Sequence, residues 1–314
     1  MDKISIIVPC YREEEALPHF WDSLKVTIED IQDVDFEFLF VDDGSSDKTL
    51  SVVKGFSQED SRVKYISFSR NFGKESAMYA GLENSTGDYV VIMDADMQDP
   101  PGLLPVMYNT VKREGYDCAA ARRVNRKGEP KIRSFCARMF YKIMRKITKI
   151  DIVDGARDFR MMSRQMVDAI VSMSEYNRFS KGIFSWVGFN TKWLEYENVK
   201  RVEGETKWSM WKLLLYSFEG IIAFSTVPLA ISSIIGIILC LLSFVGIVIV
   251  VIRQLIWQNS AYGWASMISI ILMLSGIQLF SIGILGQYLA KTYLEVKRRP
   301  LYIIKDSNIY REEK

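Results

Sequence analysis

The chain has 314 residues, of which 49% are hydrophobic, and its 40 lysines and arginines nearly balance 38 aspartates and glutamates, leaving a net charge of +2. This apolar fraction is high for a purely soluble protein, and no nucleic-acid partner is expected. The single histidine, His19, excludes zinc sites and triads that need several histidines, and the four cysteines show no metal-ligand spacing and are expected to be reduced packing residues.

The first apolar stretch, residues 4–8, is too short for the core of a signal peptide. It is followed at once by Arg12 and by three glutamates, Glu13, Glu14 and Glu15. We therefore expect the first domain to stay in the cytosol.

Short apolar runs rich in Ile, Val and Phe alternate with helical patterns up to residue 121. The runs are 4–8, 36–41, 63–67, 89–93 and 118–121. Strands that alternate with helices predict βαβ units and an α/β fold with a mainly parallel sheet. Ligands of such sheets bind beyond the carboxyl ends of the strands, so the residues at those ends are the candidate functional residues.

The first two predicted strands each end in candidate ligand-binding residues. After the first strand, Pro9 and Tyr11 could wall a flat base, and Glu13 could accept a hydrogen bond from that base or from a ribose. The second strand ends in Asp42 and Asp43, followed by a Gly-Ser-Ser-Asp turn and cap. Two adjacent carboxylates are costly to bury without partners, so we expect at least one to meet a ligand or a cation.

The fourth predicted strand runs directly into Asp94, Asp96 and Gln98, which are followed by Asp99 and two prolines. Carboxylates spaced i, i+2 at a strand end can both reach one hard cation. Such a cation commonly binds a diphosphate and stabilises it as it leaves. A three-residue match of this kind is frequent and often marks only a turn, but its position after an apolar strand favours a Mg²⁺ or Mn²⁺ site.

The second half of the chain indicates a membrane anchor. Residues 122–146 are strongly basic, residues 208–218 are amphipathic, and two runs without any charged residue follow at 220–252 and 254–290. Each run exceeds the roughly 20 residues that a transmembrane helix needs. Basic residues follow the second run, whereas only Arg253 lies between the runs, so both chain ends should be cytoplasmic. We therefore predict a catalytic domain at 1–207, an interfacial helix at 208–224, transmembrane helices at 225–253 and 262–290, and a cytoplasmic tail at 291–314.

Four motifs in order, IIVPCYREEEAL, FVDDGSSDKT, SRNFGKESAMYAGL and GDYVVIMDADMQDPP, resemble the inverting glycosyltransferase family 2 with its GT-A nucleotide-sugar fold. The segments RRVNRKGEPKIRSFCARMFYKI, DFRMMSR and GETKWS and the two apolar runs are similar to the polyprenyl-phosphate glycosyltransferase branch, which is related to dolichyl-phosphate mannose synthase. The resemblance covers nearly the whole chain. It implies a multi-pass protein of the cytoplasmic membrane, and a homo-oligomer is left open.

Site residues follow from this resemblance position by position. Nucleotide contacts are implied for Pro9, Tyr11, Glu13 and Asp43, metal contacts for Asp94, Asp96 and Gln98, lipid-phosphate contacts for Arg122, Arg126, Arg133 and Ser134, and closure over the donor for Lys207 with Ser209. Arg123 is an equally good candidate for the phosphate. Asp158 could orient a sugar hydroxyl, act as a base or form a structural salt bridge.

The implied reaction is a single displacement, with inversion, that moves one hexose from a UDP-sugar to polyprenyl phosphate. The acceptor has a second pKa of about 6, so it is mostly dianionic at neutral pH and needs no strong base. UDP-glucose is the preferred donor, with UDP-N-acetylglucosamine, UDP-galactose and GDP-mannose left open.

Other classes of protein fit the sequence less well. A processive polysaccharide synthase would carry a Gln-x-x-Arg-Trp signature, which is absent from the sequence. A sugar-lipid flippase component needs ionisable residues at mid-membrane depth, and the two runs carry none apart from Arg253 at an edge. Intact Asp94, Asp96 and Gln98 argue against an inactive binding module. Dinucleotide-binding and kinase-like folds lack their glycine motifs here.

Overall fold

A computed structural model of the chain describes residues 1–124, 139, 153, 155–196, 221–222, 225–257 and 263–309. The chain divides into two compact units. The sheet unit comprises Met1–Ser217 together with Arg299–Lys314, and the helical unit comprises Phe218–Arg298. Of the interfacial helix predicted at 208–224, the structure describes only residues 221 and 222, and both are helical. The other residues of that prediction lie outside the described part of the chain.

The sheet unit is built on a sheet with the strand order β7-β5-β6-β4-β1-β2-β3-β8. The strands are β1 (Asp2–Cys10), β2 (Val34–Asp42), β3 (Val63–Phe68), β4 (Tyr89–Ile92), β5 (Cys118–Arg123), β6 (Ala156–Ser163), β7 (Thr191–Tyr196) and β8 (Ile304–Ser307). Pairing is parallel for β1 with β2 and β4, for β2 with β3 and for β5 with β7. Pairing is antiparallel for β3 with β8 and for β6 with both β4 and β5. The predicted α/β class with a mainly parallel sheet is confirmed.

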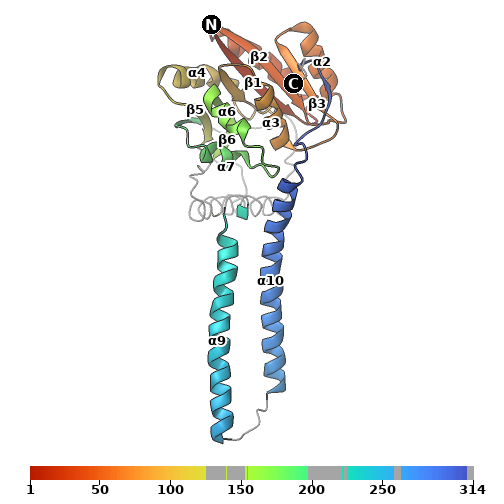
Figure 1. Ribbon diagram of the computed structural model, residues 1–314. Helices are drawn as coiled ribbons and strands as arrows, with labels where there is room; N and C mark the ends of the chain where they lie inside the picture. Colours follow the sequence, from red (N-terminus) through yellow and green to blue (C-terminus); the bar gives the residue numbers. More distant parts are fainter. Residues whose placement is uncertain are drawn as a thin grey trace. The chain divides into compact units, whose positions relative to one another are not determined.

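Helices cover both faces of this sheet (Figure 1). They are α1 (Ala16–Glu29), α2 (Thr49–Glu59), α3 (Lys74–Asn84), the short 3-10 helix η1 (Pro101–Leu103), α4 (Leu104–Arg113), α6 (Arg164–Ser172) and α7 (Ser180–Trp186). Side chains of α1, α2 and α4 share one buried cluster with alternate residues of β1 and β2. Trp21 of α1 is central to it, with its ring 4.9 Å from the ring of Phe38 and 5.5 Å from that of Phe56. The single histidine, His19, is exposed on α1.

The opposite face of the sheet is covered by α3, α6 and α7. Helix α3 lies very close to β1, and the glycine at position 81 allows this approach. A Cβ added to Gly81 would be only 2.2 Å from Cγ2 of Ile7. This close approach holds α3 against β1.

The residues after the helical unit form the edge strand β8. The ring of Tyr302 stacks on buried Phe68 with a centroid distance of 4.9 Å, and the amide of Ser69 donates to the carbonyl of Ile303 at 2.9 Å. Asp306 pairs with Lys54 at 2.5 Å. The segment expected only as a cytoplasmic tail therefore completes the sheet.

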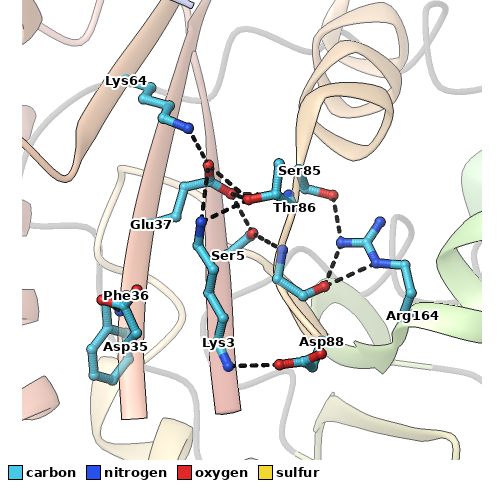
Figure 2. Close-up of polar contacts among 11 residues, drawn as sticks. Lys3, Ser5, Asp35, Phe36, Glu37, Lys64, Ser85, Thr86, Asp88 and Arg164 are labelled. Atoms are coloured by element: carbon cyan, nitrogen blue, oxygen red, sulfur yellow. Dashed lines mark hydrogen bonds and ion pairs between the residues drawn. The ribbon is translucent and has the colours of Figure 1, made fainter. Parts of the chain in front are cut away.

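A buried polar cluster lies near the amino ends of β1 and β4 (Figure 2). The side chain of Glu37 on β2 is only 2% exposed and accepts from Ser5 Oγ and Lys64 Nζ, each at 2.6 Å. Thr86 adds its backbone amide at 3.0 Å and its hydroxyl at 3.1 Å. Burial raises the pKa of Glu37, but Lys64, Ser5 and Thr86 together outweigh it and leave that pKa below its usual value. The carboxylate is therefore the charged centre of a satisfied network that joins β1, β2, β3 and the turn before β4.

The helical unit contains the long helices α9 (Val227–Trp257) and α10 (Trp264–Val296). Each includes a stretch long and apolar enough to cross a membrane, Val227–Gly246 and Met273–Val296. Large apolar side chains point outward on both helices, as shown by Phe244 and Phe280, which are 66% and 68% exposed. A helix that is apolar all round is not stable in water, so these surfaces are suited to lipid.

Candidate active site

The carboxyl ends of β1, β2, β3, β4, β5 and β7 lie at one edge of the sheet, because these strands run in the same direction. Strands β6 and β8 run the other way and begin at this edge. We define this edge as the site edge. It brings together residues 9–13, 42–45, 69–73, 93–99, 122–124 and 156–158, which include every described candidate that the sequence predicts.

Asp42 and Asp43 are almost fully buried, at 2% and 3% exposed. Asp42 accepts from the amide of Ser45 at 3.0 Å and from the hydroxyl of Ser67 at 2.8 Å. Asp43 accepts from the amides of Phe72 at 2.6 Å and Gly73 at 2.9 Å. The protein thus satisfies both carboxylates without a ligand, and Asp43 holds the loop that leads into α3. Contact of Asp43 with a nucleotide stays a prediction.

Gly44 makes the approach of these two loops possible. Its φ of +65° is in the left-handed region, and an added Cβ would lie 2.4 Å from the carbonyl carbon of Arg70. The turn expected at Gly44 is therefore present, and its lack of a side chain also lets loop 69–73 pack against it.

Asp94, Asp96 and Gln98 follow β4 and are half-buried at the site edge. The amide of Gln98 donates to Asp96 Oδ1 at 3.1 Å, across Met97, whose φ of 58° is left-handed. Gln98 Oε1 accepts from the guanidinium of Arg157 at 3.2 Å and from that of Arg123 at 3.5 Å, so the structure places Gln98 among cations, and its role as a metal ligand stays a prediction.

A second network, which the sequence does not predict, lies directly behind this turn. Asp99 is fully buried, and its Oδ1 accepts from Arg157 Nε at 3.0 Å and from the hydroxyl of Tyr196 at 2.5 Å. Burial and the charge of Asp99 raise the pKa of Tyr196 above its usual value, so this hydroxyl stays protonated as a donor. The network ties the loop after β4 to the start of β6 and the end of β7.

Lys74, the first residue of α3, also belongs to the site. Its ammonium lies 2.7 Å from Asp94 Oδ1 and 2.6 Å from Asp158 Oδ2. Lys74 thus bridges Asp158 to Asp94, and Asp158 forms a salt bridge there, whereas its role in the reaction stays a prediction. Asp158 is a candidate site residue from the sequence, whereas Lys74 is not, although Lys74 lies in the SRNFGKESA motif.

The remaining candidates divide into described and undescribed residues. Pro9, Tyr11 and Glu13 are half-buried at the end of β1, and the amide of Glu13 donates to Thr49 Oγ1 at 2.9 Å. Arg122 ends up half-buried on β5, with a long 3.5 Å ion pair to Glu195 that contributes little. Arg126, Arg133, Ser134, Lys207 and Ser209 lie outside the described residues.

The acids after β4 suit a divalent cation that also binds phosphate. In the described part of the chain, no three Asp, Glu, His or Cys side chains converge as they would in a site made of protein ligands alone. Mg²⁺ and similar ions, however, are commonly held by one or two carboxylates plus substrate phosphates and water. Asp94 already faces a cation, the ammonium of Lys74, so its surroundings favour positive charge. Asp94 and Asp96 thus fit such an ion.

The titration of Asp43 gives a testable pH dependence. Burial, with a contribution from Asp42, raises its pKa from 3.8 to about 6, although the amides of Phe72 and Gly73 and the charge of Arg70 favour the ionised form. Between pH 3.8 and about 6, the folded protein therefore holds a proton on Asp43 that the unfolded chain has lost. The contribution of Asp43 to the free energy of unfolding is greatest below pH 3.8 and falls as the pH rises through about 6. At about 1.4 kcal/mol per pKa unit, the change is up to about 3 kcal/mol.

Comparison with Asp43→Asn, which cannot titrate, isolates this group. The melting temperature of the wild-type protein should fall relative to that of Asp43→Asn as the pH rises from about 4 to about 7. A difference between the two proteins that is independent of pH would contradict the raised pKa.

Comparisons with known proteins agree with this architecture. The family model described as "Glycosyl transferase family 2" matches residues 5–171. The "Putative glycosyltransferase CsbB" of Bacillus subtilis is 44% identical, covering 98% of this chain and 92% of the relative. The "Bactoprenol glucosyl transferase" of Shigella phage SfII is 40% identical, covering 98% of each.

Among solved structures, glucosyl-3-phosphoglycerate synthase from Mycobacterium tuberculosis in complex with Mn²⁺ and UDP-glucose is similar, with a TM-score of 0.47 and 17% identity, covering 70% of this chain and 77% of that chain. The family match spans more than half of the sequence, and the relatives match at nearly full length. The protein is a glycosyltransferase with a GT-A catalytic domain followed by two long apolar helices, and it belongs to glycosyltransferase family 2.

Proposed function

We propose that this protein transfers a single hexose, with glucose preferred, from a UDP-sugar to polyprenyl phosphate at the cytoplasmic face of the membrane. The observation that carries the proposal is the match, along nearly the whole chain, to relatives named bactoprenol glucosyl transferases. The site edge and the two apolar helices supply the chemistry and the location that such a reaction needs.

The donor half of the reaction is assigned to the acids that follow β4. Asp94 and Asp96 would hold Mg²⁺ or Mn²⁺ against the diphosphate, and the bound ion would offset the charge that develops on the departing UDP. Pro9, Tyr11, Glu13 and Asp43, on the neighbouring strand ends, would contact the nucleotide. The Asp99 network behind the turn keeps Asp96 in place by anchoring Arg157 and Gln98.

The acceptor half is assigned to the guanidinium groups at the end of β5 and in the basic segment that follows it. Arg122 and Arg123 stand at the site edge, and Arg126, Arg133 and Ser134 continue the same segment. Guanidinium groups bind phosphate oxygens with two parallel hydrogen bonds and would offset its repulsion from the donor. They would also hold one oxygen in line with the anomeric carbon.

Asp158 is better suited to orienting than to accepting a proton. Burial raises its pKa, but Lys74 and Lys181 outweigh that effect and hold the pKa well below its usual value. A carboxylate with so low a pKa is a poor base at neutral pH. A dianionic phosphate acceptor does not need a base, so this environment agrees with the proposed reaction.

The location follows from α9 and α10. Their apolar surfaces would place the catalytic domain beside the bilayer, where a polyprenyl chain is dissolved, and Lys297, Arg298 and Arg299 after α10 favour the cytoplasmic side.

The test is a transfer assay with the purified full-length protein in detergent. It uses undecaprenyl phosphate, Mn²⁺ and, in parallel, UDP-glucose, UDP-galactose, UDP-N-acetylglucosamine and GDP-mannose. We expect a lipid-linked hexose, with the highest kcat/KM for UDP-glucose, and no product when undecaprenol without its phosphate is the acceptor. Absence of lipid-linked product with every donor would refute the proposal, and preference for GDP-mannose would refute the choice of donor.

A further inference from the structure

Lys74 occupies a position that the proposed reaction does not by itself explain. Its ammonium lies between two carboxylates, 2.7 Å and 2.8 Å from the two oxygens of Asp94 and 2.6 Å from Asp158. The side chains of Asp94 and Asp158 are only 21% and 18% exposed, whereas that of Lys74 is 42% exposed. The lysine thus bridges two carboxylates that are each less exposed than the lysine itself.

The two acids come from neighbouring strands of the sheet. Strands β4 and β6 are antiparallel, and Ile92, the last residue of β4, pairs with Arg160. Asp94 follows Ile92 by two residues and Asp158 precedes Arg160 by two, and both carboxylates contact the ammonium of Lys74. Like charges held this close repel, and the ammonium between them offsets that repulsion.

The position of Lys74 in its own helix does not account for that cation. It is the first residue of α3, where the helix dipole disfavours a positive charge. The carboxylates of Asp94 and Asp158, at 2.6–2.8 Å, hold the ammonium in place against that dipole.

We propose that Lys74 is a positioning residue and the resident counter-ion of the donor site: it holds Asp94 and Asp158 together until a divalent cation binds, and that cation displaces it from Asp94. Lys74 then remains paired with Asp158 alone. This inference rests on the proposed function, because it presumes that Asp94 binds a metal. The ammonium of Lys74 and the divalent ion would then compete for the carboxylate of Asp94.

Two roles for Lys74 predict different metal affinities when the lysine is removed: competition with the divalent ion for Asp94, and simple cross-linking of α3 to the sheet. If Lys74 only cross-links, its removal lowers stability and leaves the affinity for a divalent ion unchanged or weaker. If Lys74 competes, its removal frees Asp94 from the ammonium that bridges it to Asp158. Mn²⁺ should then bind about tenfold more tightly in the absence of nucleotide, since the ion no longer has to displace a charge a few ångströms away.

The experiment titrates Mn²⁺ alone into the full-length protein in detergent and measures free Mn²⁺ by electron paramagnetic resonance. The variants are Lys74→Met, Lys74→Gln as a second neutral replacement, Lys74→Arg, and Asp94→Asn. Lys192→Met is the matched control, because Lys192 is similarly exposed, at 37%, and is paired with one carboxylate, that of Glu114. A thermal melt of each variant shows whether it is folded.

We expect Lys74→Met and Lys74→Gln to bind Mn²⁺ about tenfold more tightly than the wild type, and Lys74→Arg and Lys192→Met to bind it as the wild type does. Asp94→Asn should weaken binding. If Asp94→Asn weakens binding but the neutral Lys74 variants bind no more tightly, the inference is overturned and the metal assignment stands. If Asp94→Asn leaves binding unchanged, the metal assignment falls and the inference with it.

Discussion

Replacing Asp96 with asparagine should lower kcat for sugar transfer about a thousandfold, with little change in overall stability. The carboxylate is half-buried in the turn after β4, where it accepts from the amide of Gln98 at 3.1 Å, and an asparagine oxygen can keep that bond. What is lost is one negative ligand of the ion that stabilises the departing diphosphate. Such stabilisation is worth several kcal/mol, and about 4 kcal/mol corresponds to a factor of about a thousand in rate.

The matched control is Asp168→Asn on α6. Asp168 is 66% exposed and forms a long, 3.6 Å ion pair with Arg164, so its replacement should leave kcat within about twofold. Initial rates with UDP-glucose and undecaprenyl phosphate over a range of Mn²⁺ concentrations measure both variants. Turnover of Asp96→Asn equal to that of the control would show that Asp96 does not bind the metal.

The second large effect concerns stability. Glu37→Ala should lower the free energy of unfolding by about 3 kcal/mol, because it removes the buried charge around which Lys64, Ser5 and Thr86 are arranged (Figure 2). This expected loss of free energy is at the low end for a broken buried ion pair, because the side chain of Lys64 is 34% exposed and its ammonium can be hydrated once Glu37 is removed. For a domain of this size, the melting temperature should fall by about 6–12 °C.

Glu114→Ala is the control for this measurement. Glu114 is also paired with a lysine, Lys192, but its side chain is 45% exposed, so its loss should cost less than about 1 kcal/mol. Differential scanning fluorimetry of the full-length protein in detergent compares the two. Equal shifts for the two variants would mean that the buried network contributes no more than a surface ion pair. Because Glu37 is remote from the site edge, folded Glu37→Ala should retain its KM for the donor.

The strands of the fold could be predicted where local pattern and burial agree. Residues 4–8, 36–41, 63–67 and 118–121 all lie inside observed strands, because a strand buried on both faces must be apolar along its whole length. Strand β8 could not be predicted in this way. Its residues, Ile304–Ser307, are mixed in polarity, and they are stabilised by contacts such as Lys54 with Asp306, 252 residues apart in the chain.

The location of the candidate site could be predicted in part from topology. Because the carboxyl ends of parallel strands meet at one edge of a sheet, Asp43, Asp94 and Asp96 could be placed at that edge from position alone. Lys74 and Asp99 were not, because a lone lysine at a helix start and an acid before two prolines are typical of solvated surface. Their significance depends on the antiparallel strand β6, which brings Arg157 and Asp158 to the site edge from some 60 residues further along the chain.

The most direct measurement is anomalous X-ray scattering at the manganese edge from crystals of the full-length protein grown with Mn²⁺ and UDP. We expect one Mn²⁺ peak at the site edge, within coordination distance of Asp94 or Asp96 and of diphosphate oxygens, with the base of UDP near Tyr11. Mn²⁺ and UDP bound together at a place that includes neither acid would contradict the account.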